Sequence, residues 1–169
     1  MKLIEREGDR VVFRMSAREK KLLERLLSLY PLQSGHAARL THETGPRWDE
    51  ANQLLAEASK EQKTELAAWV ARRLTEGEAF VASGASWRLV LEGGDVERLL
   101  QVLNELRIGS WIKLGRPEDL DAVDPDDTAV AMAPLHWLLV LTGQFQMVLI
   151  HALYGDVGPG PDAASTPPS

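Results

Sequence analysis

The chain has 169 residues, a net charge of −6 at pH 7 and no cysteine. This length suits one domain with a full hydrophobic core, and the absence of cysteine excludes disulfides, thiolate metal sites and cysteine nucleophiles. The acidic charge argues against nucleic-acid binding, because counterion release from a polyphosphate requires clustered Lys and Arg. The charged N-terminal stretch lacks the apolar segment of a signal peptide, so we expect a cytoplasmic protein.

Two strands are predicted at the N-terminus and a third in the middle of the chain. Alternating apolar residues around Phe13 and a Gly8-Asp9 turn predict a β-hairpin over residues 2–15. One face of the stretch "SWRLVLE" carries its large apolar side chains, Trp87, Leu89 and Leu91. We therefore expect a three-stranded antiparallel sheet, and we interpret "EGEAFVASGAS" as a linker.

The first two helices are marked by their end signals. Ser16 and Glu19 have the spacing of a capping box, and Pro31 ends the helix that follows. Pro46 suits a first helical position and opens a long helix to about Thr75. Its apolar stripe consists of Ala51, Leu54, Leu55, Ala58, Leu66, Trp69, Val70 and Leu74. The stripe weakens at "SKEQKTE", where we expect a solvated segment with a kink or a break.

A third helix is predicted after the stretch "EGG". Asp95 is its expected N-cap, and Gly115 and Pro117 end it. Its broad apolar face consists of Val96, Leu99, Leu100, Leu103, Leu106 and Trp111. The stretch "EGGDVE" lacks the pattern of a phosphate-binding loop, so we interpret it as a helix start.

The last helix raises the question of a membrane, because no Asp, Glu, Lys or Arg occurs between Thr128 and Gly155. Its interruptions are polar and would be costly in lipid: His136, Thr142, Gln144, Gln146 and His151. No Lys or Arg lies close enough to anchor a span. We therefore predict no membrane association but a buried central helix, capped by Asp126 or Asp127. Residues 155–169 are predicted to form a disordered tail after one globular domain, residues 1–154.

Polar groups on a buried helix must be satisfied inside the protein. Asn104 and Arg107 lie one turn apart on the preceding helix. From there the Arg107 guanidinium could reach the carbonyl of Gln144 or Gln146, or the carboxylate of Glu105. Two interpretations stay open, a structural hydrogen-bond network and the lining of a binding cleft.

No catalytic or metal-binding constellation is evident. The loop histidines His36 and His42, with Glu43 beside them, lack the spacing of a helical zinc pair. His136 and His151 would lie roughly 22 Å apart on one helix. Motifs for a serine nucleophile, a phosphate loop and a dinucleotide fold are all missing. We predict no catalytic residue, no metal and no cofactor.

One tryptophan is open to two interpretations. Trp48, near the start of the long helix, is the tryptophan least clearly assigned to the core. It is either a core residue or part of a surface that contacts a partner.

The stretch "LVLEGGDVERLLQVLNELRIGSWIKLG" resembles the bacterial family known as domain of unknown function two-zero-one-seven. The matching residues are Leu89, Leu91, Asp95, Leu99, Leu103, Asn104, Glu105, Leu106, Arg107, Leu114 and Gly115. The last helix matches at Trp137, Leu138 and residues 143–147, and "VVFRMSAREKKLLERLL" resembles the opening strand and helix of the family.

The resemblance covers most of residues 1–154. It implies a mostly helical bacterial cytosolic domain without assigned catalytic residues. In actinobacteria, genes of this family often lie beside one for a Clp-protease adaptor and others for cysteine biosynthesis. The resemblance thus implies a partner role in regulated proteolysis or in sulfur metabolism.

These patterns predict an α-dominated α+β domain, with about four main helices around a buried C-terminal helix and a small three-stranded antiparallel sheet. The leading hypothesis is a non-enzymatic interaction or regulatory protein with a protein partner. The alternative is a small-ligand binding protein or an enzyme, with a cleft near Asn104 and Arg107. A homodimer through exposed helix faces is compatible with either hypothesis.

Overall fold

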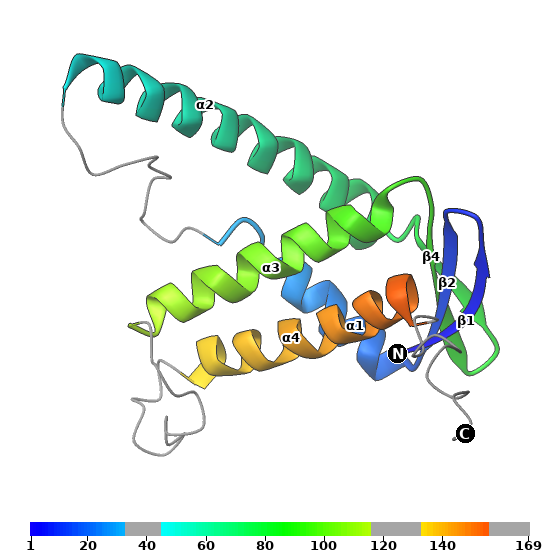
Figure 1. The fold of residues 1–169 in the computed structure, drawn as a ribbon. Helices are drawn as coiled ribbons and strands as arrows, with labels where there is room; N and C mark the ends of the chain where they lie inside the picture. Colours follow the sequence, from blue (N-terminus) through cyan, green and yellow to red (C-terminus); the bar gives the residue numbers. More distant parts are fainter. Residues whose placement is uncertain (33–44, 116–132, 156–169) are drawn as a thin grey trace, which may run out of the picture.

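The computed structural model describes residues 1–32, 45–115 and 133–155. The elements in chain order are β1 (Lys2–Glu7), β2 (Arg10–Met15), α1 (Ala17–Leu27), α2 (Pro46–Trp69), the π-helix η1 (Val70–Thr75), β3 (Phe80–Ser83), β4 (Ser86–Leu91), α3 (Asp95–Lys113) and α4 (Ala133–Tyr154). The strands gather at one end of the molecule, and the long helices extend away from them (Figure 1). The prediction of an α-dominated α+β fold is confirmed.

The sheet has four antiparallel strands in the order β1-β2-β4-β3. The predicted hairpin is confirmed, with Gly8 at a φ of 60° in its turn. The prediction of three strands was wrong, because β3 lies inside the stretch interpreted as a linker. Its signal was a two-residue turn: Ser83 pairs with Ser86, and Gly84 between them has a φ of 59°.

The inner face of the sheet supplies one wall of the core. Phe13 pairs with Leu89, and Leu89 pairs on its other side with Phe80, so three buried side chains lie side by side across the strands. Cross-strand contacts of this kind stabilise a sheet. At the edge of this row the Lys20 ammonium of α1 lies 4.8 Å from the centroid of the Phe80 ring and 4.6 Å from that of Trp87.

Helix α1 begins with the predicted capping box. The Ser16 hydroxyl accepts a hydrogen bond from the Glu19 N–H at 3.2 Å, and the Glu19 carboxylate accepts one from the Ser16 N–H at 2.7 Å. Two backbone donors at the start of the helix are therefore satisfied without water. The buried face that follows consists of Leu23, Leu26 and Leu27.

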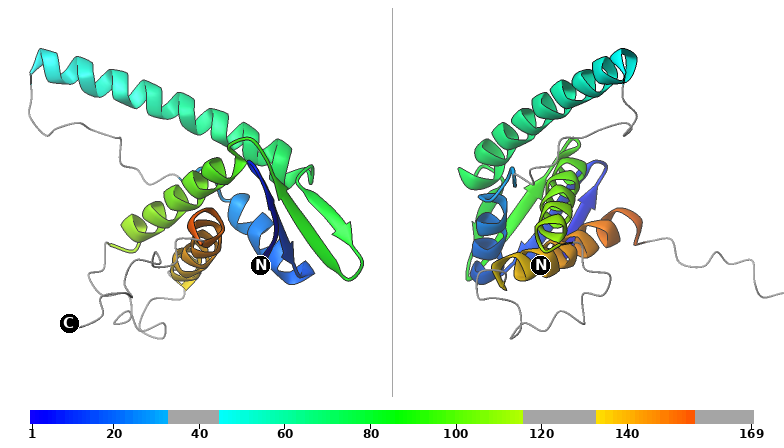
Figure 2. Two further views of the ribbon diagram at one scale, coloured as in Figure 1. Left: turned by 45° about the vertical axis from the view of Figure 1, so that its right-hand side comes forward. Right: turned by 90° about the vertical axis from the view of Figure 1, so that its left-hand side faces the viewer.

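Helix α2 differs from expectation in two ways. It is continuous through residues 59–65, so the expected kink or break there was wrong, and the irregular geometry comes later, in η1. Its predicted apolar stripe is buried only toward the C-terminal end, where the buried members are Leu66, Trp69, Val70 and Leu74. None of residues 46–65 is buried. The N-terminal part of α2 therefore projects away from the other helices, as Figures 1 and 2 show.

Helices α3 and α4 lie side by side and form the main helical contact (Figure 1). Two buried hydroxyls are satisfied by their own helices: Ser110 donates to the Leu106 carbonyl at 2.7 Å, and Thr142 to the Leu138 carbonyl at 2.7 Å. The expected caps of α4, Asp126 and Asp127, lie outside the described residues, as does nearly all of the predicted tail.

Among the described residues, helix α4 is covered on one side and is not enclosed, contrary to the expectation of a buried central helix. Its inner residues are buried: Leu138, Leu139, Thr142, Phe145, Leu149 and Ala152. On the opposite side Trp137 and Met147 are each 62% exposed and Tyr154 is 65% exposed. Within the described ranges, α4 is the one helix that is long and apolar enough to cross a membrane by length and composition, and one third of its most apolar window is buried.

Replacing Ser16 with Ala should lower the free energy of unfolding by about 1 kcal/mol, because one donor at the start of α1 loses its acceptor. Urea denaturation measures this loss. The control is Ser28→Ala, which removes only an exposed hydrogen bond to the Arg25 carbonyl at the other end of the helix. Equal effects of the two substitutions would contradict a stabilising role of the capping box.

Candidate functional site

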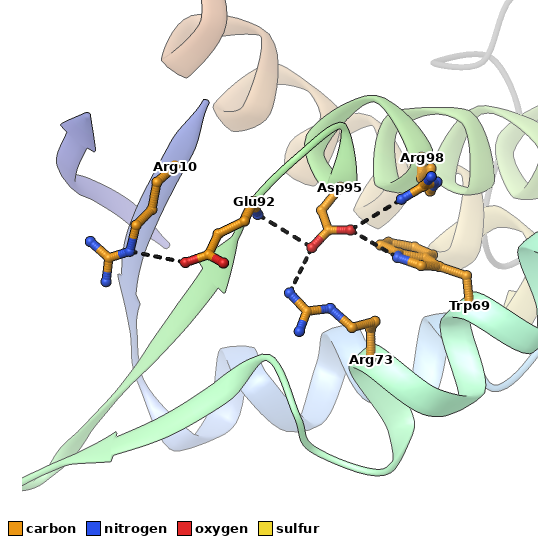
Figure 3. A network of polar contacts seen from close by, with 6 residues as sticks. All are labelled: Arg10, Trp69, Arg73, Glu92, Asp95 and Arg98. Atoms are coloured by element: carbon orange, nitrogen blue, oxygen red, sulfur yellow. Dashed lines mark hydrogen bonds and ion pairs between the residues drawn. The ribbon is translucent and has the colours of Figure 1, made fainter. Parts of the chain in front are cut away.

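The most enclosed charged group in the described residues is the Asp95 carboxylate, which is 4% exposed. Asp95 is the first residue of α3, and Gly94, with a φ of 80°, is the N-cap. The prediction that Asp95 caps α3 was therefore wrong by one position. The Asp95 carboxylate instead contacts side chains of α2 and η1 and groups around the start of α3 (Figure 3).

Four donors surround this carboxylate. Oδ1 accepts a hydrogen bond from the Trp69 indole at 3.0 Å, and Oδ2 accepts one from the Arg73 guanidinium at 2.7 Å. The Glu92 N–H donates to Oδ2 at 3.3 Å, and Arg98 contacts Oδ1 at 3.5 Å. Because Trp69 ends α2 and Arg73 lies in η1, Asp95 fastens this junction to the start of α3.

The electrostatics of the site favour the charged form of Asp95. Burial acts to raise the pKa of this carboxyl, but hydrogen bonds from Arg73, from the Glu92 N–H and from Trp69, together with the Arg73 charge, outweigh burial and hold the pKa below its ordinary value. The hydrogen bond to Asp95 in turn raises the pKa of Arg73. Both groups are therefore charged at neutral pH.

The network extends to the sheet. The Glu92 carboxylate, directly after β4, accepts a hydrogen bond from Arg10 of β2 at 3.1 Å, so the contacts run from α2 and η1 through Asp95 and Glu92 to the sheet (Figure 3). Arg10 also pairs with Glu5 of β1. The Glu92–Arg10 pair is exposed, and surface pairs of this kind stabilise little. The energetic weight of the network therefore lies at Asp95.

A polar cleft opens beside Asp95, between α2 and α3. Its volume is about 330 Å³, and its lining includes Gln62, Glu65, Arg72, Arg98 and Gln101. Trp69 and Leu66 form its apolar part. The cleft therefore presents two guanidinium groups and two amides to a small ligand, with the Glu65 carboxylate beside them.

A second pocket, of about 570 Å³, lies between β1 and the C-terminal end of α4. At its rim the Arg6 guanidinium donates to the carbonyls of Ala152 and Leu153 at 3.0 and 3.1 Å. The last carbonyls of a helix are available to such donors, and a cation there also interacts favourably with the helix dipole. Arg6 thus joins the edge of the sheet to the end of α4.

The residues predicted to form a network or a cleft are not joined to one another. Among the described residues, no hydrogen bond or ion pair links Asn104, Arg107, Gln144 and Gln146. Arg107 and Gln144 are exposed, and the other two are half-buried. Whether any of them contacts a ligand stays a prediction.

Glu105, the fifth residue of that prediction, has a hydrogen-bond partner in Tyr30, which follows α1. Its carboxylate accepts a hydrogen bond from the Tyr30 hydroxyl at 3.1 Å. Burial, with the charge and the hydrogen bond of Glu105, raises the pKa of Tyr30. Glu105 therefore fixes the end of the first helical segment against α3.

The remaining candidates lie at the surface or outside the described residues. Trp48 is 39% exposed on the projecting part of α2. The loop residues His36, His42 and Glu43 lie outside the described part. Within it, no group of three or more metal-ligating side chains occurs. His151 is exposed, and the buried Nδ1 of His136 has no hydrogen-bond partner among the described residues.

Sequence reasoning missed Trp69, Arg73 and Arg98 as partners of Asp95. A signal existed, because Trp69 and Arg73 are four residues apart and therefore lie on one face of a helix. The sequence does not reveal that this face packs against the Asp95 carboxylate, which lies 22 residues after Arg73. Comparison with family models, with curated proteins and with solved structures finds no match for the chain.

Replacing Asp95 with Asn should lower the free energy of unfolding by about 2 to 3 kcal/mol at pH 7, because Arg73 loses its charged acceptor. The folded-state pKa of Asp95 lies below the unfolded value of about 3.9. This contribution is therefore fully present above that value and is lost as the pH falls through the folded-state pKa. Urea denaturation from pH 7 downward should show the gap between the two proteins closing below about pH 4.

Glu19, whose pKa is also lowered, is present in both proteins and cancels in the difference. The difference in unfolding free energy between the two proteins should shrink at about pH 2, well below the unfolded-state pKa of about 3.9. A difference that stays constant down to that pH would show that the charge of Asp95 does not stabilise the fold.

Proposed function

We propose that the protein acts by binding another protein and is not itself a catalyst. The observation that carries this proposal is the projecting part of α2, residues 46–65, in which no residue is buried. A helix of 24 residues is roughly 36 Å long, and helices in proteins gain most of their stability from packing. The fold anchors only the C-terminal end of α2, at Leu66 and Trp69.

The projecting part carries side chains suited to a protein contact. Trp48 is 39% exposed and Leu54 is 60% exposed, and charged residues surround them along the helix. An exposed tryptophan among polar side chains is typical of interaction hot spots. This supports an interaction or regulatory role in which α2 presents a recognition surface to a different protein.

The resemblance to the bacterial family suggests which partners to test first. They are components of a regulated protease, its adaptor, and enzymes of sulfur metabolism. A cytoplasmic location belongs to the same proposal, since these partners are cytoplasmic.

Trp48→Ala should weaken capture of the partner, because truncation of a hot-spot tryptophan costs about 2 kcal/mol or more, about 30-fold in affinity. The measurement is a pull-down from a lysate of the source organism with the tagged full chain, quantified by mass spectrometry. The control is Leu29→Ala, which truncates a 47% exposed leucine after α1. Proteins captured equally by wild type and by Trp48→Ala would contradict a role of α2 in recognition.

A second candidate function is the binding of a small anion in the cleft between α2 and α3. It is favoured by Arg72 and Arg98, which line the same cleft as the amides of Gln62 and Gln101. Guanidinium groups bind carboxylate and phosphate in two-point geometry. Such a ligand would lie beside the Asp95 network and would contact both α2 and α3.

Arg72→Met should abolish this binding and leave the fold intact, because Arg72 is exposed and lies outside the hydrogen bonds of Asp95. The measurement is the thermal stability of the protein in a panel of phosphates and small carboxylic acids. Arg47→Met, at the far end of α2, is the control for loss of charge alone. The same stabilisation by anions in wild type and in Arg72→Met would rule out this cleft as the site.

A further inference from the structure

The exposed side of α4 is a continuous surface without charge. We define the outer face of α4 by its exposed residues from position 137 onward: Trp137, Val140, Gln144, Met147, Ile150, His151 and Tyr154. Six of the seven follow spacings of three and four residues, as in the seam of a coiled coil. Buried residues occupy the opposite side, so the single chain covers one face of α4 and leaves the outer face exposed.

We infer that this outer face binds a second copy of the same chain, with the two α4 helices antiparallel. Absence of charge is the first argument. A symmetric dimer brings identical patches together, so each residue meets the partner's copy of the same surface. Like charges would repel there, and the outer face has none, although the chain as a whole carries a net charge of −6.

The second argument is a protrusion and a recess at matching positions. Trp137, 62% exposed, protrudes from α4. The pocket beside β1 is lined along α4 by Met147, Val148, His151, Ala152 and Gly155, and the last four are spaced as the residues that receive a side chain from a facing helix. Its walls are Leu3 and Arg6. The volume of about 570 Å³ accommodates an indole.

The third argument is the position of the two features along α4. Trp137 lies seven residues before Gln144, and the recess is centred seven to eight residues after it. They are about four turns apart and therefore on the same side of the helix. A two-fold axis beside Gln144 thus places each Trp137 in the recess of the other copy, where the Arg6 guanidinium would lie at the ring.

A lipid surface suits the outer face less well. Helices that lie on membranes carry Lys and Arg along their polar side, and α4 contains neither. Gln144 and His151 would lose hydrogen bonds in lipid, whereas across a symmetric interface they can donate to and accept from the partner. The inference concerns a different face from the projecting part of α2 and does not depend on the proposed function.

The test begins with the mass of the full chain in solution, by light scattering after size exclusion, at concentrations up to about 100 µM, far above the Kd of a stable interface. Wild type should have twice the chain mass of 18.7 kDa. Trp137→Ala should raise the Kd of the dimer at least about tenfold. The control is Val81→Ala, on β3, which truncates a 50% exposed side chain elsewhere and should leave the Kd unchanged.

A second variant separates dimer loss from misfolding. Gln144→Glu should yield a monomer with wild-type helix content by circular dichroism, because two like charges would meet beside the two-fold axis, whereas residue 144 is exposed in the single chain. A dimer that survives both Gln144→Glu and Trp137→Ala would overturn the inference.

The orientation is tested with single cysteines, since the chain has none of its own. In an antiparallel dimer a short bismaleimide should cross-link Gln144→Cys, and it should not cross-link Tyr154→Cys, whose two copies would lie about 30 Å apart. Cross-linking of both variants would indicate a parallel pair and overturn the inference. So would a monomeric wild type, whether its outer face then captures a different protein, floats with vesicles of anionic lipid or binds neither.

Discussion

The described fold depends on one buried carboxylate. Asp95 accepts hydrogen bonds from the end of α2, from η1 and from the chain just before α3, so it fixes the angle at which α2 leaves the body. A buried acid is costly unless it is paired, and here Arg73 and Trp69 provide the pairing. Without that pairing α2 would be held only by its few buried apolar residues, because none of residues 46–65 is buried.

The same site explains the local departure from α-helical geometry. Between Trp69 and the start of β3 the chain must bury Leu74 in the core and also turn Arg73 toward Asp95. In η1 each turn of helix is wider than in an α-helix, which changes the directions of successive side chains. π-helical turns are often found at functional sites. The cleft lined by Arg72 and Arg98 begins next to this turn.

Local signals made much of the fold predictable. The Ser16–Glu19 capping box, the Gly8 turn and the alternation around Phe13 each depend on residues close in sequence, and all three are confirmed. β3 was missed because a four-residue strand ending in Ser83 offers too few alternations to stand out from a loop. The site was harder to predict. An Asp at the start of a helix is most simply interpreted as an N-cap, and the partners of Asp95 on α2 and η1 are distant in sequence.

Helix α4 shows where sequence pattern reaches its limit. A run without charge satisfies three environments equally well: the middle of a soluble core, a lipid bilayer, and the interface between two protein chains. Composition cannot separate them, because each selects against the same residue types. The structure separates them by side: Leu138 and Leu149 are buried, whereas Trp137 and Met147 face outward with a recess beside them. An uncharged helix that is half covered within one chain is explained most simply when a second protein surface completes it, and the matched positions of Trp137 and the recess favour its own copy.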